Sequence, residues 1–83
     1  MAVRSGWAWG TTDGGEWLTI LGSHWSAPTL AGTAAEAVLP EAASAPWLRD
    51  RMVLAHVTEM WHPGVASGRA YRINQIEQTS EEH

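Results

Sequence analysis

The stretch from Trp47 to Trp61, WLRDRMVLAHVTEMW, decides between two folds for this chain. As a helix, it carries apolar side chains at i, i+1, i+4, i+7 and i+8, which is the stripe of an amphipathic helix. The stripe consists of Val53, Leu54, Val57, Met60 and Trp61. As a strand from Met52, it has an apolar face that Glu59 interrupts. That face consists of Val53, Ala55, Val57 and Trp61. Periodicity alone favours a helix over residues 46–61.

The residues that follow favour the strand. Residues 62–68 (HPGVASG) are rich in turn formers, and residues 69–76 alternate as a strand does. This pattern predicts a hairpin over residues 52–76. Two hairpins bury more apolar surface together than one hairpin and a helix, because a small sheet needs several strands to be stable. We therefore favour a β-rich fold. The alternative is an N-terminal hairpin followed by a helix over residues 46–61 and a C-terminal strand.

A second hairpin signal lies at the N-terminal end. Residues 3–9 and 16–21 are bulky or β-branched, and the loop between them, GTTDGG, holds the Asp-Gly and Gly-Gly pairs that tight turns use. The sequence thus predicts an antiparallel hairpin over residues 3–21. Alternation puts Trp7 and Trp9 on one face of its first strand, and Trp17 on a face of the second, where cross-strand aromatic contacts are possible.

Residues 22–46 form a crossover rich in Ala, Ser and Pro that joins the two hairpins. Thr33 and Glu36 have the spacing of a capping box, which predicts a short helix over residues 34–39 before Pro40 ends it. Such a long connection with few large apolar side chains is uncommon in a compact domain unless it is functional, disordered or laid on a partner. Residues 77–83 are a polar C-terminal tail. The expected fold is a β-rich α+β domain over residues 1–76, in which the hairpins form a small sheet or barrel.

The composition excludes several classes of protein. The chain has 83 residues, six of them Trp, no Cys and a formal net charge of −4. Without cysteine there is no disulfide framework. Its five Arg and Lys residues form no basic run, which argues against binding to nucleic acid. No stretch has the length and apolar character of a membrane span or a signal peptide. We expect a protein that stays in the cytoplasm of the producing cell, or in a virion if a phage encodes it.

Catalytic and metal-binding patterns are weak. His56, Glu59 and His62 are three residues apart, whereas two helical zinc ligands need i, i+4 spacing. Ser23, His24 and Ser26 lie near Asp13 and Glu16, but no nucleophile elbow surrounds them. Gly14 and Gly15 indicate a turn, because no phosphate-binding helix start follows them. We expect neither an enzyme nor a protein that needs a cofactor or metal.

The tryptophans are the best functional signal, because Trp is favoured both in small cores and at interfaces. We expect about half of the indoles in the core and the rest exposed. The candidate interface residues are Trp7, Trp9, Trp25, Trp47, Arg49, Arg51 and Trp61. The hypothesis is a non-enzymatic structural protein that assembles with other protein subunits, its own copies included. A component of a bacteriophage virion is its concrete form. The alternative is a small-ligand or carbohydrate-binding module with a platform of stacked indoles.

Overall fold

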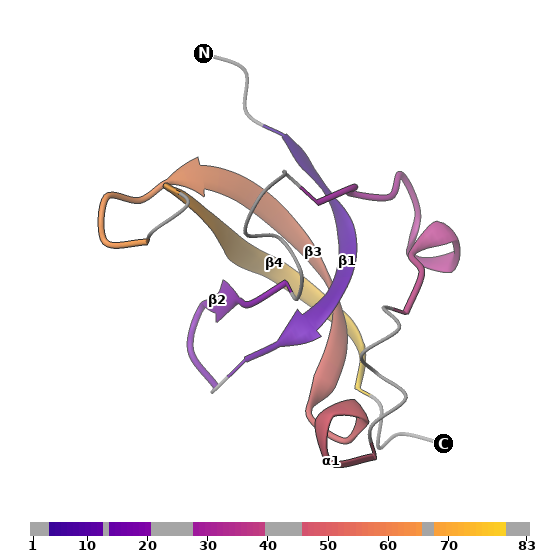
Figure 1. The fold of residues 1–83 in the computed structure, drawn as a ribbon. Helices are drawn as coiled ribbons and strands as arrows, with labels where there is room; N and C mark the ends of the chain where they lie inside the picture. The colour runs from indigo at the N-terminus through magenta and orange to yellow at the C-terminus, as the bar shows by residue number, and fades with distance from the viewer. Residues whose placement is uncertain (1–3, 13, 21–27, 40–45, 66–67, 80–83) are drawn as a thin grey trace.

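The computed structural model is built on a four-stranded antiparallel sheet with the strand order β1-β3-β4-β2 (Figure 1). It describes residues 4–12, 14–20, 28–39, 46–65 and 68–79. The strands are β1 (Ser5–Thr11), β2 (Trp17–Leu18), β3 (Met52–Trp61) and β4 (Arg69–Thr79). Two single-turn helices, η1 (Ala34–Glu36) and α1 (Pro46–Arg49), precede β3. The β-rich character predicted from the sequence is confirmed.

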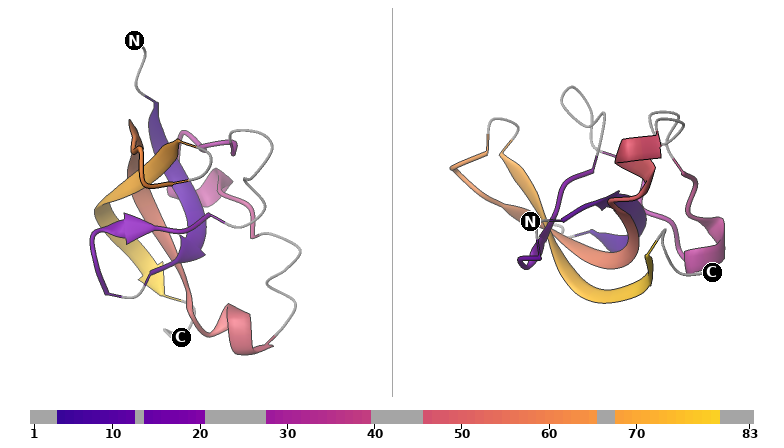
Figure 2. Two further views of the ribbon diagram at one scale, coloured as in Figure 1. Left: turned by 60° about the vertical axis from the view of Figure 1, so that its left-hand side comes forward. Right: turned by 90° about the horizontal axis from the view of Figure 1, so that it is seen from below.

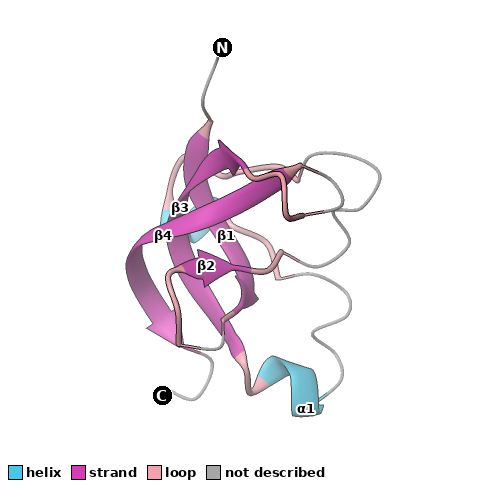
Figure 3. Ribbon diagram, turned by 90° about the vertical axis from the view of Figure 1, so that its left-hand side faces the viewer, coloured by secondary structure: helices cyan, strands magenta, loops and turns pink. Residues whose placement is uncertain are grey.

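The β3–β4 hairpin forms the centre of the sheet. Its antiparallel register runs from the pair Trp61 and Arg69 to the pair Val53 and Thr79. The alternative helix over residues 46–61 is wrong, because helical structure ends at Arg49 and α1 leads directly into β3 (Figure 3). β3 lies between two strands and is covered on both faces, so its first four residues, MVLA, are all buried. A strand buried on both faces has a continuous apolar run, which also matches helical spacing. β4 continues to Thr79, past the predicted end at residue 76.

The N-terminal hairpin predicted over residues 3–21 requires a correction. β1 pairs with β3, in a register that places Ala8 opposite Ala55, while β2 pairs with β4. Among the described residues, β1 and the second half of the predicted hairpin (residues 16–20) meet only at one bridge, between Thr11 and Thr19. The sheet is therefore open. The curvature of the β3–β4 hairpin brings these two edges together (Figure 2). β1 and β2, which are neighbours in the sequence, therefore form opposite edges of the sheet, because the β3–β4 hairpin lies between them.

The main core cluster lies on one face of the sheet, whereas Met52 and Leu54 are buried on the other, and it contains no indole among the described residues. It is formed by Ala8, Leu18, Val53, Ala55, Val57 and Tyr71, with Ile20, Leu30 and Ile73 packed against it. The residues of β1 on this face are its smallest, Gly6, Ala8 and Gly10, whereas Trp7 and Trp9 lie on the other face. A Cβ on Gly6 or Gly10 would overlap the backbone oxygen of Ala31 or Thr19. The expectation that about half of the indoles form the core is wrong for the five described tryptophans. The close approach of two chain segments to β1 leaves no room there for a ring.

The described part of the crossover packs on its own domain. Trp7 and Ala31 exchange two backbone hydrogen bonds, of 2.8 and 2.9 Å, and Leu30 joins the core. The short helix predicted over residues 34–39 is only a 3-10 turn, Ala34–Glu36. Thr33 makes no side-chain cap to a backbone N–H, and its hydroxyl donates to the Glu36 carboxylate instead. No helix among the described residues has the length and apolar character needed to cross a membrane.

Candidate functional site

The two most exposed indoles of the described residues lie at opposite ends of the sheet. Trp47 belongs to α1, just before β3, and is 70% exposed. Trp61 is the last residue of β3 and is 71% exposed. α1 and the β3–β4 turn mark these two ends in Figure 1. A strand of this length spans up to roughly 30 Å. The two rings therefore form two separate exposed apolar surfaces.

The ring of Trp61 is held by the turn that follows it. His62 N–H donates to the Gly68 carbonyl at 2.9 Å, and Gly68 N–H donates to the Val65 carbonyl at 2.8 Å. Gly68 has a φ of 78°, in the region that favours glycine. A Cβ at this position would overlap the six-membered ring of Trp61. Because Gly68 has no side chain, the exposed indole of Trp61 can pack directly against the Gly68 backbone.

A second apolar group surrounds this turn and was missed by the sequence analysis. Trp17 stands edge-on to His62, with ring centroids 5.6 Å apart. Trp17, Met60 and Val65 are 37%, 40% and 38% exposed, so the turn carries apolar surface beyond Trp61. The sequence held a signal for this residue, because Trp17 lies two residues after the glycine-rich loop. It held no signal for the neighbourhood of Trp17, because β2 packs on β4 and not on β1.

Trp7 and Trp9 are half-buried on the outer face of β1. The Trp7 ring meets the His56 ring edge-on, with centroids 5.2 Å apart. The Asn74 amide lies 3.0 Å from His56 Nδ1 and donates to the Thr58 hydroxyl at 2.8 Å. These contacts cover part of the indole and hold His56 beside it. Trp7 and Trp9 are thus less available for contacts than the two end residues.

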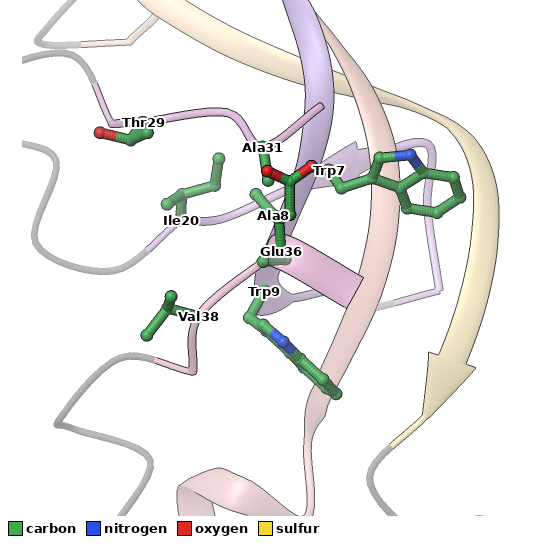
Figure 4. Close-up of a pocket in the computed structure, with 9 residues that line it drawn as sticks. Trp7, Ala8, Trp9, Ile20, Thr29, Ala31, Glu36 and Val38 are labelled. Carbon is green, nitrogen blue, oxygen red and sulfur yellow. The ribbon is translucent and has the colours of Figure 1, made fainter. Parts of the chain in front are cut away.

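A pocket of about 190 Å³ lies beside β1. It is lined by Trp7, Ala8, Trp9, Ile20, Thr29, Ala31, Glu36, Ala37 and Val38. The rings of Trp7 and Trp9 point away from Ile20, Thr29 and Val38 (Figure 4). The two residues therefore line the pocket mainly through their main chain and Cβ atoms, and their rings do not form a stacking platform inside it.

An ionic cluster closes the core near the exposed turn. Arg4 makes two hydrogen bonds to the Glu59 carboxylate, of 2.6 and 3.2 Å, and a third to the Pro28 carbonyl at 3.0 Å. Tyr71 donates its hydroxyl to Glu59 Oε2 at 2.8 Å. The Arg4 hydrogen bond, outweighing desolvation, lowers the pKa of Glu59. Burial and the bond to Glu59 raise the pKa of Tyr71.

These shifts suit a structural role for the cluster. A general acid or base works best with a pKa near the operating pH. The pKa of Glu59 moves down and that of Tyr71 moves up, so each group is held more firmly in its ordinary charge state at neutral pH. The cluster ties residues 4 and 28 to β3 and β4. Its sequence signal was Glu59, a lone charge in an apolar strand.

The remaining candidate residues are scattered. Arg49 and Arg51 are exposed near Trp47, and Trp25 lies outside the described residues, as do Asp13, Ser23, His24 and Ser26. No group of three metal-ligating side chains occurs in the described part of the chain. His56 contacts Asn74, Glu59 binds Arg4, and His62 Nδ1 accepts the Gly64 N–H at 3.1 Å. The three metal-capable residues thus have separate environments.

Comparisons of this chain with protein-family models, curated proteins and solved structures find no match.

Proposed function

We propose that this chain is a non-enzymatic structural protein that assembles with further copies of itself through its two indole-bearing ends. The supporting observation is the exposure of Trp47 and Trp61, 70% and 71%, at opposite ends of β3. Large exposed apolar groups on a small domain are typical of contact surfaces, and Trp is prominent among residues that anchor interfaces.

The energetics favour covering these rings. Removing about 140 Å² of each indole from water would contribute roughly 3.5 kcal/mol, at about 25 cal/mol per Å². Association itself costs about 4–15 kcal/mol in lost freedom and ordering. Two covered indoles therefore support a weak contact, to which the apolar group around Trp17 and Met60 adds area.

The positions of the two ends favour head-to-tail contacts. In such a heterologous contact, the α1 end of one copy meets the turn end of the next, and repeated contacts build rings or filaments. A virion component is the concrete form of this proposal. A carbohydrate-binding module is less well supported, because it needs neighbouring indoles in one concave site, and the Trp7 and Trp9 rings point away from the pocket (Figure 4).

Sedimentation velocity over a concentration series tests the proposal. Wild-type chain should associate as its concentration rises, and Trp47→Ala and Trp61→Ala should each stay monomeric. A mixture of the two variants should form dimers, because each retains the end that the other lacks. Ile76→Ala, which trims an apolar side chain 47% exposed in the middle of β4, is the control and should associate like the wild type.

Acrylamide quenching of Trp emission provides a second measurement on the same samples. The emission should become more protected as the wild-type chain associates, and should stay accessible in the two Trp variants. A wild-type chain that remains monomeric at high concentration, with freely quenched indoles, would overturn the proposal. Quenching protection by sugars in a monomer would favour the carbohydrate-binding alternative.

A further inference from the structure

The exposed apolar group at the turn end includes a thioether. Met60 is the penultimate residue of β3, and its side chain is 40% exposed. Its cross-strand partner on β4 is Ala70, whose single methyl group is too small to cover a methionine side chain. The sulfur of Met60 is therefore open to solutes in the surrounding water.

The other methionine that the structure describes has the opposite environment. Met52 is the first residue of β3 and is fully buried, with 0% of its surface exposed. The reaction of a methionine with a dissolved oxidant depends on access to its sulfur, so the two residues should differ in reactivity. The same strand thus carries an accessible methionine at its turn end and a protected one at its α1 end.

Met60 shares a face of the sheet with the exposed indole of Trp17. The register between β3 and β4 is regular in this part of the hairpin, so Thr58 and Met60 point to the same side of β3. Arg72 of β4 pairs with Thr58 on one side and with Trp17 on the other, and paired residues share a face. Trp17 and Met60 therefore lie on either side of β4 on one face, within the span of a protein contact of ordinary size.

A peroxide converts an accessible thioether to a sulfoxide. The sulfur lone pair attacks one oxygen of hydrogen peroxide, the O–O bond breaks and an S–O bond forms. The second oxygen leaves as hydroxide, takes the proton of the transferred hydroxyl and becomes water. Sulfur loses two electrons and the peroxide gains them. The product is a polar side chain in place of an apolar one, and thiol-dependent reductases convert it back to methionine.

We propose that Met60 is a site of reversible oxidation by a peroxide, and that its sulfoxide weakens the association of copies through the turn end. The second part rests on the proposed function, because it needs the turn end to be a contact surface. Burying a polar group without a hydrogen-bond partner opposes association. Association should in turn protect Met60 from the oxidant, because a covered thioether is out of reach.

Peptide mapping by mass spectrometry tests the site, with hydrogen peroxide as the probe. In dilute wild-type chain, Met60 should oxidise at least about tenfold faster than Met52, because only the first side chain is exposed. At concentrations at which the chain associates, the rate at Met60 should fall and the rate at Met52 should stay low. Equal rates at the two methionines of the folded chain would overturn the assignment of the site.

Sedimentation velocity of the same samples tests the effect on association. Oxidised wild-type chain should associate at least about tenfold more weakly than untreated chain, and methionine sulfoxide reductases with a thiol should restore the association. Met60→Gln places a polar side chain of similar length at this position and should associate as weakly as the oxidised chain. Met60→Leu is the control, because it keeps Met1, Met52 and all six tryptophans but has no thioether at residue 60. Peroxide should leave the association of this variant at its untreated value.

The outcomes separate this inference from the proposed function. Oxidation at Met60 that leaves association unchanged would overturn the effect on assembly, and so would an equal loss of association in peroxide-treated Met60→Leu. Untreated wild-type chain that stays monomeric would overturn the proposed function and, with it, the effect on assembly. The rates at Met60 and Met52 would still decide whether Met60 is the reactive site.

Discussion

Replacing Gly10 by alanine should destabilise the domain, although it adds only one methyl group. An ideal Cβ on Gly10 would lie 2.4 Å from the Thr19 carbonyl oxygen and 2.8 Å from Leu18 Cγ. Neither the backbone at Thr19 nor the buried Leu18 side chain can move aside easily, so β1 or β2 must shift. Overpacking of this kind costs typically 1–3 kcal/mol. We expect about 2 kcal/mol, which is a fall in Tm of roughly 8–16 °C for a domain of this size.

Urea unfolding followed by Trp fluorescence measures this effect, with Gly32→Ala as the control. A Cβ on Gly32 would meet only Glu36 Oε1, at an ordinary 3.7 Å, and Gly32 has no positive φ. That variant should be neutral or gain up to about 1 kcal/mol by restricting the unfolded chain. If Gly10→Ala unfolds at the wild-type midpoint, residues 18 and 19 do not pack against β1, and the account of the core is wrong.

Three further predictions concern the ionic cluster and the indoles. Tyr71→Phe removes a partly buried hydrogen bond to the Glu59 carboxylate and should lower the free energy of unfolding in urea by about 1–2 kcal/mol; an unchanged stability would exclude the bond. The folded state lowers the pKa of Glu59, so the ionised carboxylate stabilises the fold above its unfolded pKa, and this stabilisation is lost as the pH falls through the folded pKa. Glu59→Gln should therefore flatten the loss of stability below about pH 5. An unaltered profile of stability against pH would contradict the lowered pKa. Gly68→Ala should lower the free energy of unfolding by at least about 1 kcal/mol, because Gly68 has a positive φ, and it should shift the Trp61 emission. Trp47→Ala should change the free energy of unfolding by less than about 0.5 kcal/mol, because the ring is exposed. A larger loss for Trp47→Ala than for Gly68→Ala would refute the assigned exposures.

The sequence indicated the β3–β4 hairpin because its evidence is local. The turn residues after Trp61 and the alternation after residue 69 depend on neighbours along the chain, as does the glycine-rich loop before Trp17. The same local signals misled at the N-terminal end. They placed the second segment beside β1, whereas β3 and β4 lie between the two in the sheet. No residue in the loop indicates whether β2 pairs with β1 or with β4, because the outcome depends on which pairing buries more surface.

The candidate site was predictable only in part. Trp47 and Trp61 were expected at an interface and are exposed, while Trp17 and Met60 were overlooked. The ionic cluster joins Arg4 to Glu59, which is 55 residues away in the chain, and no spacing rule predicts such a contact.

The sequence by itself determined that this chain is β-rich, where its turns occur and that it has more indole than a small core needs. These properties follow from turn chemistry, alternation and composition, which act over a few residues. Only the tertiary structure decided which strands pair, which face of β1 is buried and which indoles remain outside. The physical reason is steric: two segments approach β1 so closely that only Gly6, Ala8 and Gly10 fit on its inner face, and Trp7 and Trp9 must lie on the other.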